Sequence, residues 1–590
     1  MVNIITMCGS ENPTRGPLSS FVDHHDTILL LFFFFLSSLV KCILTLPFHA
    51  PYILGDETLY LELSRHILTV QQFSTQGNPY PPGYPLIIIP SQLLLSDFFL
   101  SYHGTLVINS FVSSLIVFPA YSIARKFLDR TVSLSLAVFV LLLPMTFLFS
   151  FAVMSENLFI PLYLFSCLAI LTAFSRNSPV WWAVTGFTLF FLYFTRTTGI
   201  APVAAFAIIL IFTAIRSGEP LSYLRTKWPV VASFVFPLFL YIAYTRLTGV
   251  RSFDFMTGGI AGYSNGDNGY LEIVLAEMGK NLPGFLTTLG RIFLNEISYY
   301  LFAAYFIFII FAVIGYRYVS EFSESDKQQD FSLLFWYSIL TSFGFIGLSS
   351  IHLATYYAPE GYTLLMGRYL EPTLPVFSIL GTIGYLKYHE LPRTRRIPGR
   401  YLCAGFILVF SIACLIIPLS YYRWANTLSL YHFIVLQKYP FAFNTNYLIV
   451  LFSVMFIMGI VLIVKKNIRL LIGFGILLSA ICIIFVYYAG FSAVNQVMSS
   501  KLEGSDAIIP YIVSVDQNSL VYFDPDFAST AQGNWLFYRA KWWSDDRITK
   551  NITRTENISY FISDKSLPYE RVLFIKRVNA TLYRNNATEV

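Results

Sequence analysis

Charge is what this 590-residue sequence lacks most: only 12% of its residues are Asp, Glu, Lys or Arg, against about a quarter in an average soluble domain. Cysteine is also scarce, with six residues and no Cys/His spacing typical of zinc sites, so neither a disulfide framework nor a zinc domain is expected. Apolar residues make up 56% of the chain and aromatic residues 18%. This composition excludes an ordinary soluble protein and predicts an integral membrane protein.

Apolar runs of about 20 residues, the length that crosses a bilayer as a helix, recur almost to the end of the chain. We expect thirteen membrane-spanning helices, at residues 27–46, 105–124, 132–150, 156–174, 180–195, 200–215, 228–246, 299–316, 331–351, 368–386, 401–420, 446–464 and 470–490. The part from 180 to 215 is open to two interpretations, because "RTTG" separates two short runs that form either one kinked pair or two tilted spans.

The distribution of Lys and Arg predicts the orientation, because both are retained on the cytoplasmic side. One set of loops holds 17 of them and the opposite set, leaving out the C-terminal domain, holds nine, and "KYHELPRTRRIPGR" (387–400) is the strongest single cytoplasmic signal. We therefore expect a multi-pass plasma-membrane protein whose N-terminal segment, 1–26, is cytoplasmic. The first helix is expected to remain as an uncleaved anchor, since no signal-peptide cleavage pattern precedes it.

Two outer loops, 47–104 and 247–298, and the tail from 491 then lie outside the membrane domain, 27–490. Four Asn-x-Ser/Thr acceptor sites agree with this orientation, although an Asn/Thr-rich tail also produces them by chance: Asn551, Asn557, Asn579 and Asn586. Short β-prone runs between turn-rich stretches, such as "SLVYFD" and "ISYFISD", predict a small extracytoplasmic α/β or β-rich domain over 491–590.

The stretch "ILGDETLYLELSRHI", 53–67, is unusually charged for a segment directly after an apolar span. From Leu59 onwards its apolar residues follow a helical period, which predicts an amphipathic helix on the membrane interface. Asp56 and Glu57 are expected to precede the first turn of this helix. A simple explanation for them is an N-cap pair, because the helix dipole favours negative charge there.

Ionisable residues recur wherever a predicted helix ends on the outer side. "MSENL" contains Glu156, "FTRTTG" contains Arg196, and "YAPEGYTLLMGRYLEPTLP" contains Glu360 and Arg368. Taken singly, each Arg has the alternative role of a snorkelling or headgroup-anchoring residue. Ionisable groups at the edge of the hydrocarbon are costly and are usually paired or functional, so their recurrence on one face favours a functional site.

Five motifs taken together, "GDETLY", "NPYPPGYPLIIIP", "MSEN", "FTRTTG" and "GRYLEPTLP", resemble integral-membrane glycosyltransferases of the GT-C superfamily. The resemblance is to the branch that contains protein O-mannosyltransferases and the bacterial aminoarabinose transferase. It implies an all-α polytopic membrane domain of GT-C type, followed by a small external domain. The low acid content and the many Asn, Tyr and Ile residues resemble archaeal proteins in composition.

The resemblance also implies a reaction: a single sugar moves from a polyprenyl (dolichyl) phosphate to an acceptor hydroxyl at the outer face, with inversion. It points to Asp56 as the general base, with Glu57 or Glu156 orienting the acceptor or sharing the negative pocket. The leaving phosphate needs cationic stabilisation, which Arg368 and Arg196 are suited to supply. Arg65 is a third choice for this role.

Further candidates for the substrate pocket are Tyr60, Tyr84, Glu360 and Tyr369. "YPPGYP" is expected to form a rigid turn, because consecutive prolines exclude helix. Some relatives have a Lys before the paired prolines, and Tyr80 stands there in this chain, which puts a lysine-to-phosphate contact in doubt. The Gly- and Asn-rich loop 251–270 is either a lid or surplus loop.

The expected partners are a polyprenyl-phosphate sugar, the lipid bilayer and an acceptor hydroxyl on a glycan, a lipid or a protein, with no nucleic acid. No obligatory metal or other cofactor is expected. Three carboxylates, those of Asp56, Glu57 and Glu156, could nevertheless hold Mg²⁺ or Mn²⁺ against the donor phosphate.

Two other functions compete with this interpretation. "KWWSDD", 541–546, is similar to the Trp-Trp-Asp motif of the oligosaccharyltransferase catalytic subunit, but its usual continuation is absent. A transporter or flippase of a lipid-linked sugar would place ionisable groups near the bilayer midplane and show internal repeats. Here Lys41 is the main charge well inside a span and no repeat is evident, so surface chemistry is favoured.

Overall fold

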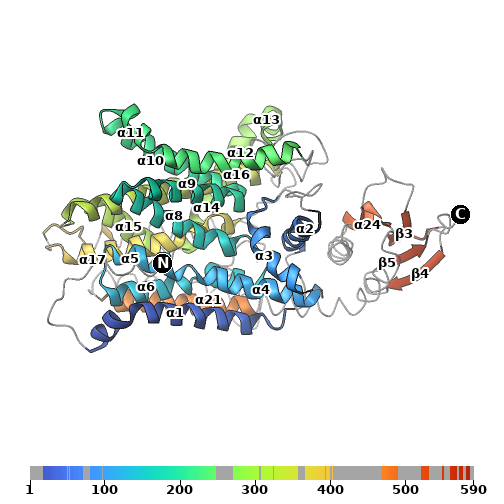
Figure 1. Ribbon diagram of the computed structural model, residues 1–590, viewed down its shortest axis with the longest axis horizontal. Helices are drawn as coiled ribbons and strands as arrows, with labels where there is room; N and C mark the ends of the chain where they lie inside the picture. Colours follow the sequence, from blue (N-terminus) through green and yellow to red (C-terminus); the bar gives the residue numbers. More distant parts are fainter. Residues whose placement is uncertain are drawn as a thin grey trace.

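The structure is a computed structural model, and it describes residues 17–48, 51, 54–70, 80–95, 98–247, 270–303, 307–322, 324–356, 366–392, 394–398, 401–402, 405, 457, 461, 467–488, 520–529, 548–549, 558–567, 570–575 and 580–584. Within these ranges the chain forms a bundle of helices and a small sheet near the C-terminus (Figure 1).

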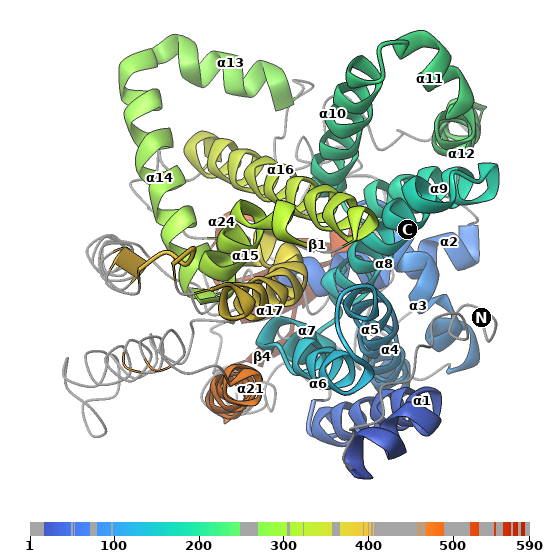
Figure 2. The same ribbon diagram turned by 90° about the vertical axis from the view of Figure 1, so that its left-hand side faces the viewer.

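The first half of the bundle consists of helices α1 (Pro17–Thr45), α2 (Leu54–Val70), α3 (Gly83–Leu94), α4 (Phe98–Ser114), α5 (Val117–Arg125), α6 (Arg130–Leu141), α7 (Pro144–Leu148), α8 (Glu156–Arg176), α9 (Pro179–Thr195), α10 (Ile200–Arg216), α11 (Pro220–Thr226) and α12 (Trp228–Leu247). Two short 3₁₀ turns lie among them, η2 (Phe149–Phe151) and η3 (Thr197–Gly199). Seen along the bundle, α8 is central, and it contacts α4, α5, α9 and α16 (Figure 2).

The second half consists of α13 (Tyr270–Lys280), α14 (Leu282–Ala303), α15 (Ile307–Arg317), η5 (Val319–Glu321), α16 (Ser325–Tyr356), η7 (Gly367–Tyr369), η8 (Glu371–Thr373), α17 (Leu374–Glu390) and α21 (Ile468–Phe485). Helices α15 and α17 pack closely, because glycines line their contact: a Cβ at Gly384 would lie 1.8 Å from the carbonyl oxygen of Phe311.

By length and composition, six helices of the described part can cross a membrane, or up to eight if each of two bent pairs is one span. The six are His25–Thr45, Leu100–Arg125, Glu156–Arg176, Thr197–Arg216, Ser325–Thr355 and Ile468–Tyr488. Large apolar side chains of α1, including Phe32, Phe35 and Ile43, are exposed, as expected for a surface that contacts lipid. The predicted polytopic, mostly helical architecture is confirmed.

The described residues include only part of the thirteen predicted spans. Two of the predicted spans, 401–420 and 446–464, fall almost entirely outside the described residues. Between residues 180 and 215, where two interpretations were open, the structure has two separate helices, α9 and α10, with η3 between them. They contact each other and also pack against different neighbours, α9 on α8 and α12 and α10 on α16, so two separate helices occupy this part.

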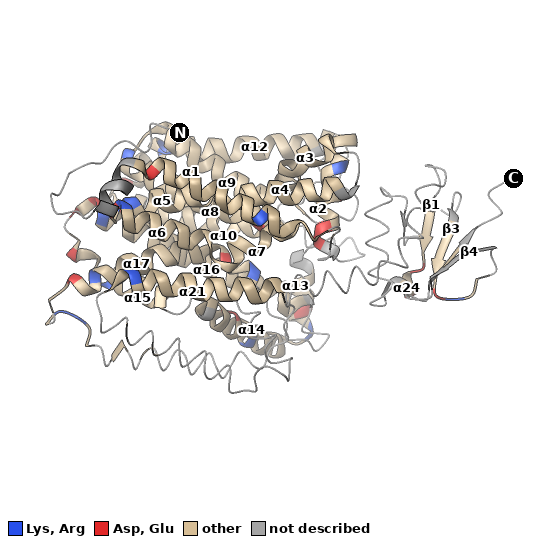
Figure 3. Ribbon diagram, turned by 90° about the horizontal axis from the view of Figure 1, so that it is seen from below, with Lys and Arg blue, Asp and Glu red and all other residues tan. Residues whose placement is uncertain are grey.

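Helices α2 and α3 pack together at one end of the bundle, and many of the Lys and Arg residues gather at the opposite end (Figure 3). Helix α2 begins at Leu54, so Asp56 and Glu57 lie inside its first turn. The prediction that they precede the first turn was wrong, because helical backbone starts before the amphipathic pattern is visible. The predicted turn "YPPGYP" is the start of α3, which begins at Gly83 directly after Pro82.

The C-terminal strands form one mixed sheet in the order β2-β1-β3-β5-β4. The strands are β1 (Leu520–Phe523), β2 (Ile548–Thr549), β3 (Ile558–Ser563), β4 (Glu570–Ile575) and β5 (Ala580–Arg584), and a short helix α24 (Pro525–Ser529) follows β1. β1 pairs in parallel with β2 and β3, while β5 pairs antiparallel with β3 and β4. The predicted small α/β or β-rich C-terminal unit is therefore confirmed as a mixed sheet.

Candidate active site

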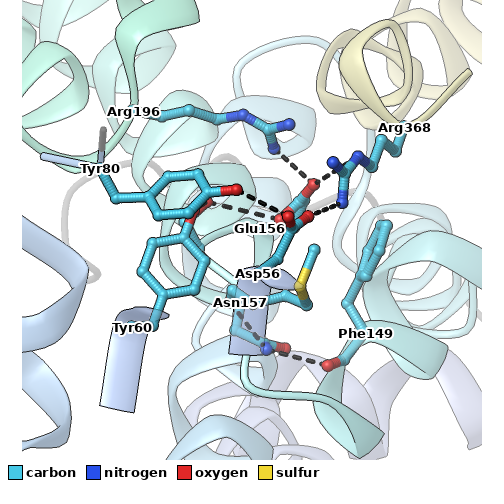
Figure 4. Close-up of polar contacts among 10 residues, drawn as sticks. Asp56, Tyr60, Tyr80, Phe149, Glu156, Asn157, Arg196 and Arg368 are labelled. Carbon is cyan, nitrogen blue, oxygen red and sulfur yellow. Dashed lines mark hydrogen bonds and ion pairs between the residues drawn. The ribbon is translucent and has the colours of Figure 1, made fainter. Parts of the chain in front are cut away.

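Asp56 accepts two short hydrogen bonds near the start of α2. Its Oδ1 accepts from the hydroxyl of Tyr80 at 2.6 Å, and its Oδ2 accepts from Nη1 of Arg368 at 2.6 Å (Figure 4). The side chains of Asp56 and Arg368 are 15% and 11% exposed, so this ion pair is largely shielded from water. A carboxylate in the first turn is also stabilised by the positive end of the helix dipole.

Arg368 is carried by η7, a single turn just before α17. The turn requires a glycine at its first residue, because a Cβ at Gly367 would lie 2.1 Å from the ring of Tyr299 on α14. The hydroxyl of Tyr299 donates to Oε1 of Glu371 on η8. These contacts of α14 fix the backbone that presents Arg368 to Asp56.

Glu156 is the first residue of α8, and only 1% of its side chain is exposed. Its Oε1 lies 2.6 Å from Nη1 of Arg196 and 4.0 Å from Nε of Arg368. Arg196 follows the last turn of α9 in extended conformation, which turns its side chain towards Glu156 (Figure 4). The motifs "MSEN" and "FTRTTG" are therefore joined by a buried ion pair.

Four charged residues thus converge from four segments: Asp56, Glu156, Arg196 and Arg368. We call them the charge cluster. Two carboxylates balance two guanidinium groups, as expected for charges that are removed from water. Nε of Arg368 is nevertheless buried without a hydrogen-bond partner among the described residues. The cluster therefore retains capacity to donate to an added anion.

Tyr369 organises both arginines of the charge cluster. The guanidinium of Arg196 lies 4.7 Å from the centre of the Tyr369 ring, and that of Arg368 lies 5.4 Å from it. Such cation–π contacts attract each cation to the ring and restrict its rotation. The predicted role of Tyr369 in the substrate pocket stays a prediction.

Three tyrosines pack against one another beside Asp56. The ring centres of Tyr60 and Tyr80 lie 4.4 Å apart, and Tyr84 meets Tyr60 edge to face at 5.1 Å. The hydroxyl of Tyr60 donates to Ser155 at 2.9 Å, and that of Tyr84 donates to Asn109 at 2.9 Å. Both Tyr60 and Tyr84 are buried, and their role in the substrate pocket stays a prediction.

The start of α3 is pressed against the end of α9. A Cβ at Gly83 would lie 2.5 Å from the carbonyl oxygen of Phe194, so only glycine allows this approach. This contact places the residues that follow Tyr80 close to the segment that carries Arg196. Sequence reasoning did not place Tyr80 in the site, and its only signal was its position before Pro81 and Pro82.

The other predicted site residues have different positions. Oε2 of the fully buried Glu57 accepts from the hydroxyl of Tyr102 at 2.9 Å and from the backbone N–H of Val153 at 2.8 Å. Nε of Arg65 lies 3.5 Å from the carbonyl oxygen of Leu61 on its own helix. Glu360 falls outside the described residues.

The pKa of Asp56 is held below its usual value. Burial raises the pKa, but the guanidinium of Arg368 and the hydrogen bond from Tyr80 lower it by more. Asp56 is therefore ionised at neutral pH and able to accept a proton. In the described part of the chain, no three His, Cys, Asp or Glu side chains gather as metal ligands, and the expectation of no obligatory metal stays a prediction.

Comparison with known proteins supports the predicted resemblance. Residues 81–245 match the family described as dolichyl-phosphate-mannose-protein mannosyltransferase. This matched part contains Glu156 and Arg196, whereas Asp56 and Arg368 lie outside it. No curated protein matches the chain in sequence.

Solved structures extend the comparison to nearly the whole chain. The crystal structure of ArnT from Cupriavidus metallidurans bound to undecaprenyl phosphate matches with a TM-score of 0.50 at 13% identity, over 95% of this chain and 98% of that one. Its apo form covers the same shares at 13% identity with a TM-score of 0.49. Residues 81–245 therefore resemble the protein mannosyltransferase family, and the chain as a whole shares the fold of ArnT, a multi-pass membrane protein.

Proposed function

We propose that this enzyme transfers a single sugar from a polyprenyl-phosphate donor to an acceptor hydroxyl, at the end of the bundle where α2 lies. The observation that carries the proposal is the charge cluster, in which Asp56 and Glu156 meet Arg196 and Arg368. The cluster combines a base with cations for a phosphate, which are the two functions that this transfer needs. ArnT bound to undecaprenyl phosphate, which shares the fold, supports the class of donor.

Asp56 serves as the general base in this proposal. Its ionised carboxylate removes the proton of the acceptor hydroxyl as the hydroxyl oxygen bonds to the anomeric carbon of the sugar. The bond between that carbon and the phosphate oxygen breaks, and its electron pair stays on the phosphate. Attack from the face opposite the phosphate inverts the anomeric carbon.

Arg368 and Arg196 receive the charge that builds up on the leaving phosphate. Both guanidinium groups are held on the ring of Tyr369 and lie within reach of one carboxylate, that of Glu156. Once they have bound the donor phosphate, cations in a site shielded from water stabilise developing charge without reorganising at the moment of reaction. Because phosphate is a good leaving group, the reaction needs no general acid.

The transporter alternative predicts charges that line a path through the membrane. Lys41, the charge inside the first span, is instead fully buried and donates to Oγ of Ser113 at 2.9 Å and to the carbonyl oxygen of Thr146 at 3.2 Å. These contacts join α1 to α4 and α7, which favours a structural role for Lys41. "KWWSDD", on which the oligosaccharyltransferase alternative depends, lies outside the described residues.

The test is sugar release by the purified full-length protein in liposomes. The donors are radiolabelled dolichyl-phosphate mannose, dolichyl-phosphate glucose and undecaprenyl-phosphate aminoarabinose, and polyprenyl-phosphate binding is measured in parallel. We expect the protein to release the sugar of at least one donor and to leave the polyprenyl phosphate behind. Binding without release of any sugar would contradict the proposal and favour the transporter alternative.

A further inference from the structure

We propose that Tyr80 is a positioning residue that holds Asp56 while Arg368 moves from Asp56 to the donor phosphate. This inference rests on the proposed function and adds a residue that the motifs did not assign. It follows from the hydrogen bonds that the two carboxylate oxygens of Asp56 accept. Oδ1 accepts from Tyr80 and Oδ2 from Arg368, each at 2.6 Å.

Two anions compete for the guanidinium of Arg368. In the structure its Nη1 binds Asp56, but in the proposed reaction the same guanidinium binds the phosphate of the donor. Carboxylate and phosphate use the same donors of an arginine fork, so they compete for it. Nε of Arg368 is buried and lacks a hydrogen-bond partner among the described residues, so the guanidinium has a donor that Asp56 does not use.

Transfer of Arg368 to the phosphate has two consequences for Asp56. Its Oδ2 becomes available to accept the proton of the acceptor hydroxyl. At the same time Asp56 loses the ion pair that orients it, and the hydrogen bond from Tyr80 to Oδ1 remains. A base must stay within hydrogen-bond distance of the proton it accepts, so a second anchor is needed at this stage.

Tyr80 is itself well fixed for this role. Its ring is held against that of Tyr60 (Figure 4). The hydroxyl of Tyr60 donates to Ser155 at 2.9 Å, and the rings of Tyr60 and Tyr84 meet edge to face. Two prolines follow Tyr80 directly and restrict its backbone. The hydroxyl is therefore preorganised by packing, independently of Arg368 and of the donor.

The hydrogen bond from Tyr80 also lowers the pKa of Asp56. This effect gives the proposal a readout that a merely structural residue would not change. The base must be ionised, so turnover falls as the pH drops through the pKa of Asp56. Removal of the Tyr80 hydroxyl raises that pKa and moves the fall in turnover to higher pH.

The test compares Tyr80→Phe with the wild type, using whichever of the three radiolabelled donors the wild type turns over. The substitution keeps the ring and removes the hydroxyl. We expect kcat to fall by at least about tenfold, while KM for the donor stays within about threefold, since the arginines that bind phosphate are intact. The acid limb of the kcat profile should move to higher pH.

Tyr121→Phe is the matched control, because the hydroxyl of Tyr121 also donates to an aspartate, Asp26, at 2.8 Å, away from the charge cluster. It should leave kcat and its pH profile unchanged. Thermal unfolding of both variants in detergent should show midpoints close to each other, which separates a change in positioning from a failure to fold.

Three results would overturn the role of Tyr80. A Tyr80→Phe enzyme with a kcat within about twofold of the control shows that the hydroxyl is not needed. A raised KM with unchanged kcat shows that Tyr80 binds the donor instead. If the wild type releases sugar from none of the three donors, the proposed function fails and the role of Tyr80 fails with it.

Discussion

The charge cluster and the surroundings of Lys41 are two ways in which this helical protein buries positive charge. The guanidinium groups of Arg196 and Arg368 are matched by two carboxylates, and the ions come from segments far apart in the sequence. The ammonium of Lys41 is bound by neutral oxygens of Ser113, Ser114 and Thr146 and lies 5.5 Å from the ring of Phe147. One site contains ions of both signs, whereas the described contacts of the other are all neutral.

The difference indicates which site can do chemistry. Carboxylate and guanidinium groups can exchange partners, because an incoming phosphate competes for the cations and frees the base. Neutral hydroxyl and carbonyl groups around Lys41 offer no such base, and they join three helices instead. The following predictions test this difference between the two sites.

The largest effect is expected for Asp56→Asn. Asparagine keeps the size and hydrogen bonding of the side chain but cannot act as the base, so kcat should fall by at least roughly hundredfold. The matched control is Asp330→Asn, which makes the same change at a carboxylate paired with Lys126 at 2.7 Å. Sugar release measured for both variants checks the prediction, and comparable losses in both would contradict it.

Arg368→Ala should mainly weaken donor use. It removes charge-assisted hydrogen bonds to the phosphate, each worth about 1.5–3 kcal/mol, so KM for the donor should rise by at least about tenfold. The value of kcat should fall as well, because the same guanidinium receives the charge that develops on the leaving phosphate. Arg368→Lys should recover only part of the loss, because lysine lacks the planar fork. The control is Arg395→Ala, at an exposed arginine paired with Glu321 at 3.3 Å. Unchanged donor KM in Arg368→Ala would show that the phosphate binds elsewhere.

Lys41→Met should leave turnover per folded molecule within about twofold of the wild type, because Met is similar in length and Lys41 takes no part in the proposed reaction. Its effect should appear in the thermal unfolding midpoint. Loss of sugar release with an unchanged thermal unfolding midpoint would contradict this difference between the two sites. It would favour the transporter interpretation, in which Lys41 has a functional role.

The smallest effect concerns the pH dependence of stability. The pKa of Asp56 is lowered by Arg368 and Tyr80 despite burial, so its ion pair stabilises the fold above the unfolded pKa of about 3.9. This contribution is lost as the pH falls through the lower pKa of the folded state. The difference in unfolding midpoint between wild type and Asp56→Asn should therefore be steady near neutral pH and shrink below about pH 4. A difference that grows on acidification would contradict the sign.

Much of the fold could be predicted because apolar length and helical period act locally. Predicted spans such as 27–46, 156–174 and 470–490 coincide with α1, α8 and α21, and "SLVYFD" contains β1. The start of α2 was misjudged, because its first residues do not show the amphipathic pattern. Strands β2 and β5 were not predicted, since pairing with β1, β3 and β4 stabilises short segments that are weak by themselves.

The residue types of the site could be predicted, but not their pairing. Asp56 and Glu57 are adjacent in sequence, yet successive side chains of a helix point about 100° apart, so one reaches Arg368 and the other Tyr102. Sequence spacing does not indicate which one faces the arginines. Tyr80 was missed for a similar reason, since its contact with Asp56 depends on the packing of α3 against α9.

The central claim is that the arginines of the charge cluster bind the donor phosphate and Asp56 performs the chemistry. A single-turnover measurement tests it directly: donor is bound to wild type and to Asp56→Asn, and both retained donor and released sugar are counted from the same sample. We predict that Asp56→Asn retains the donor at least as well as the wild type, because a competing anion is gone, and releases almost no sugar. Release at the wild-type rate would contradict the claim.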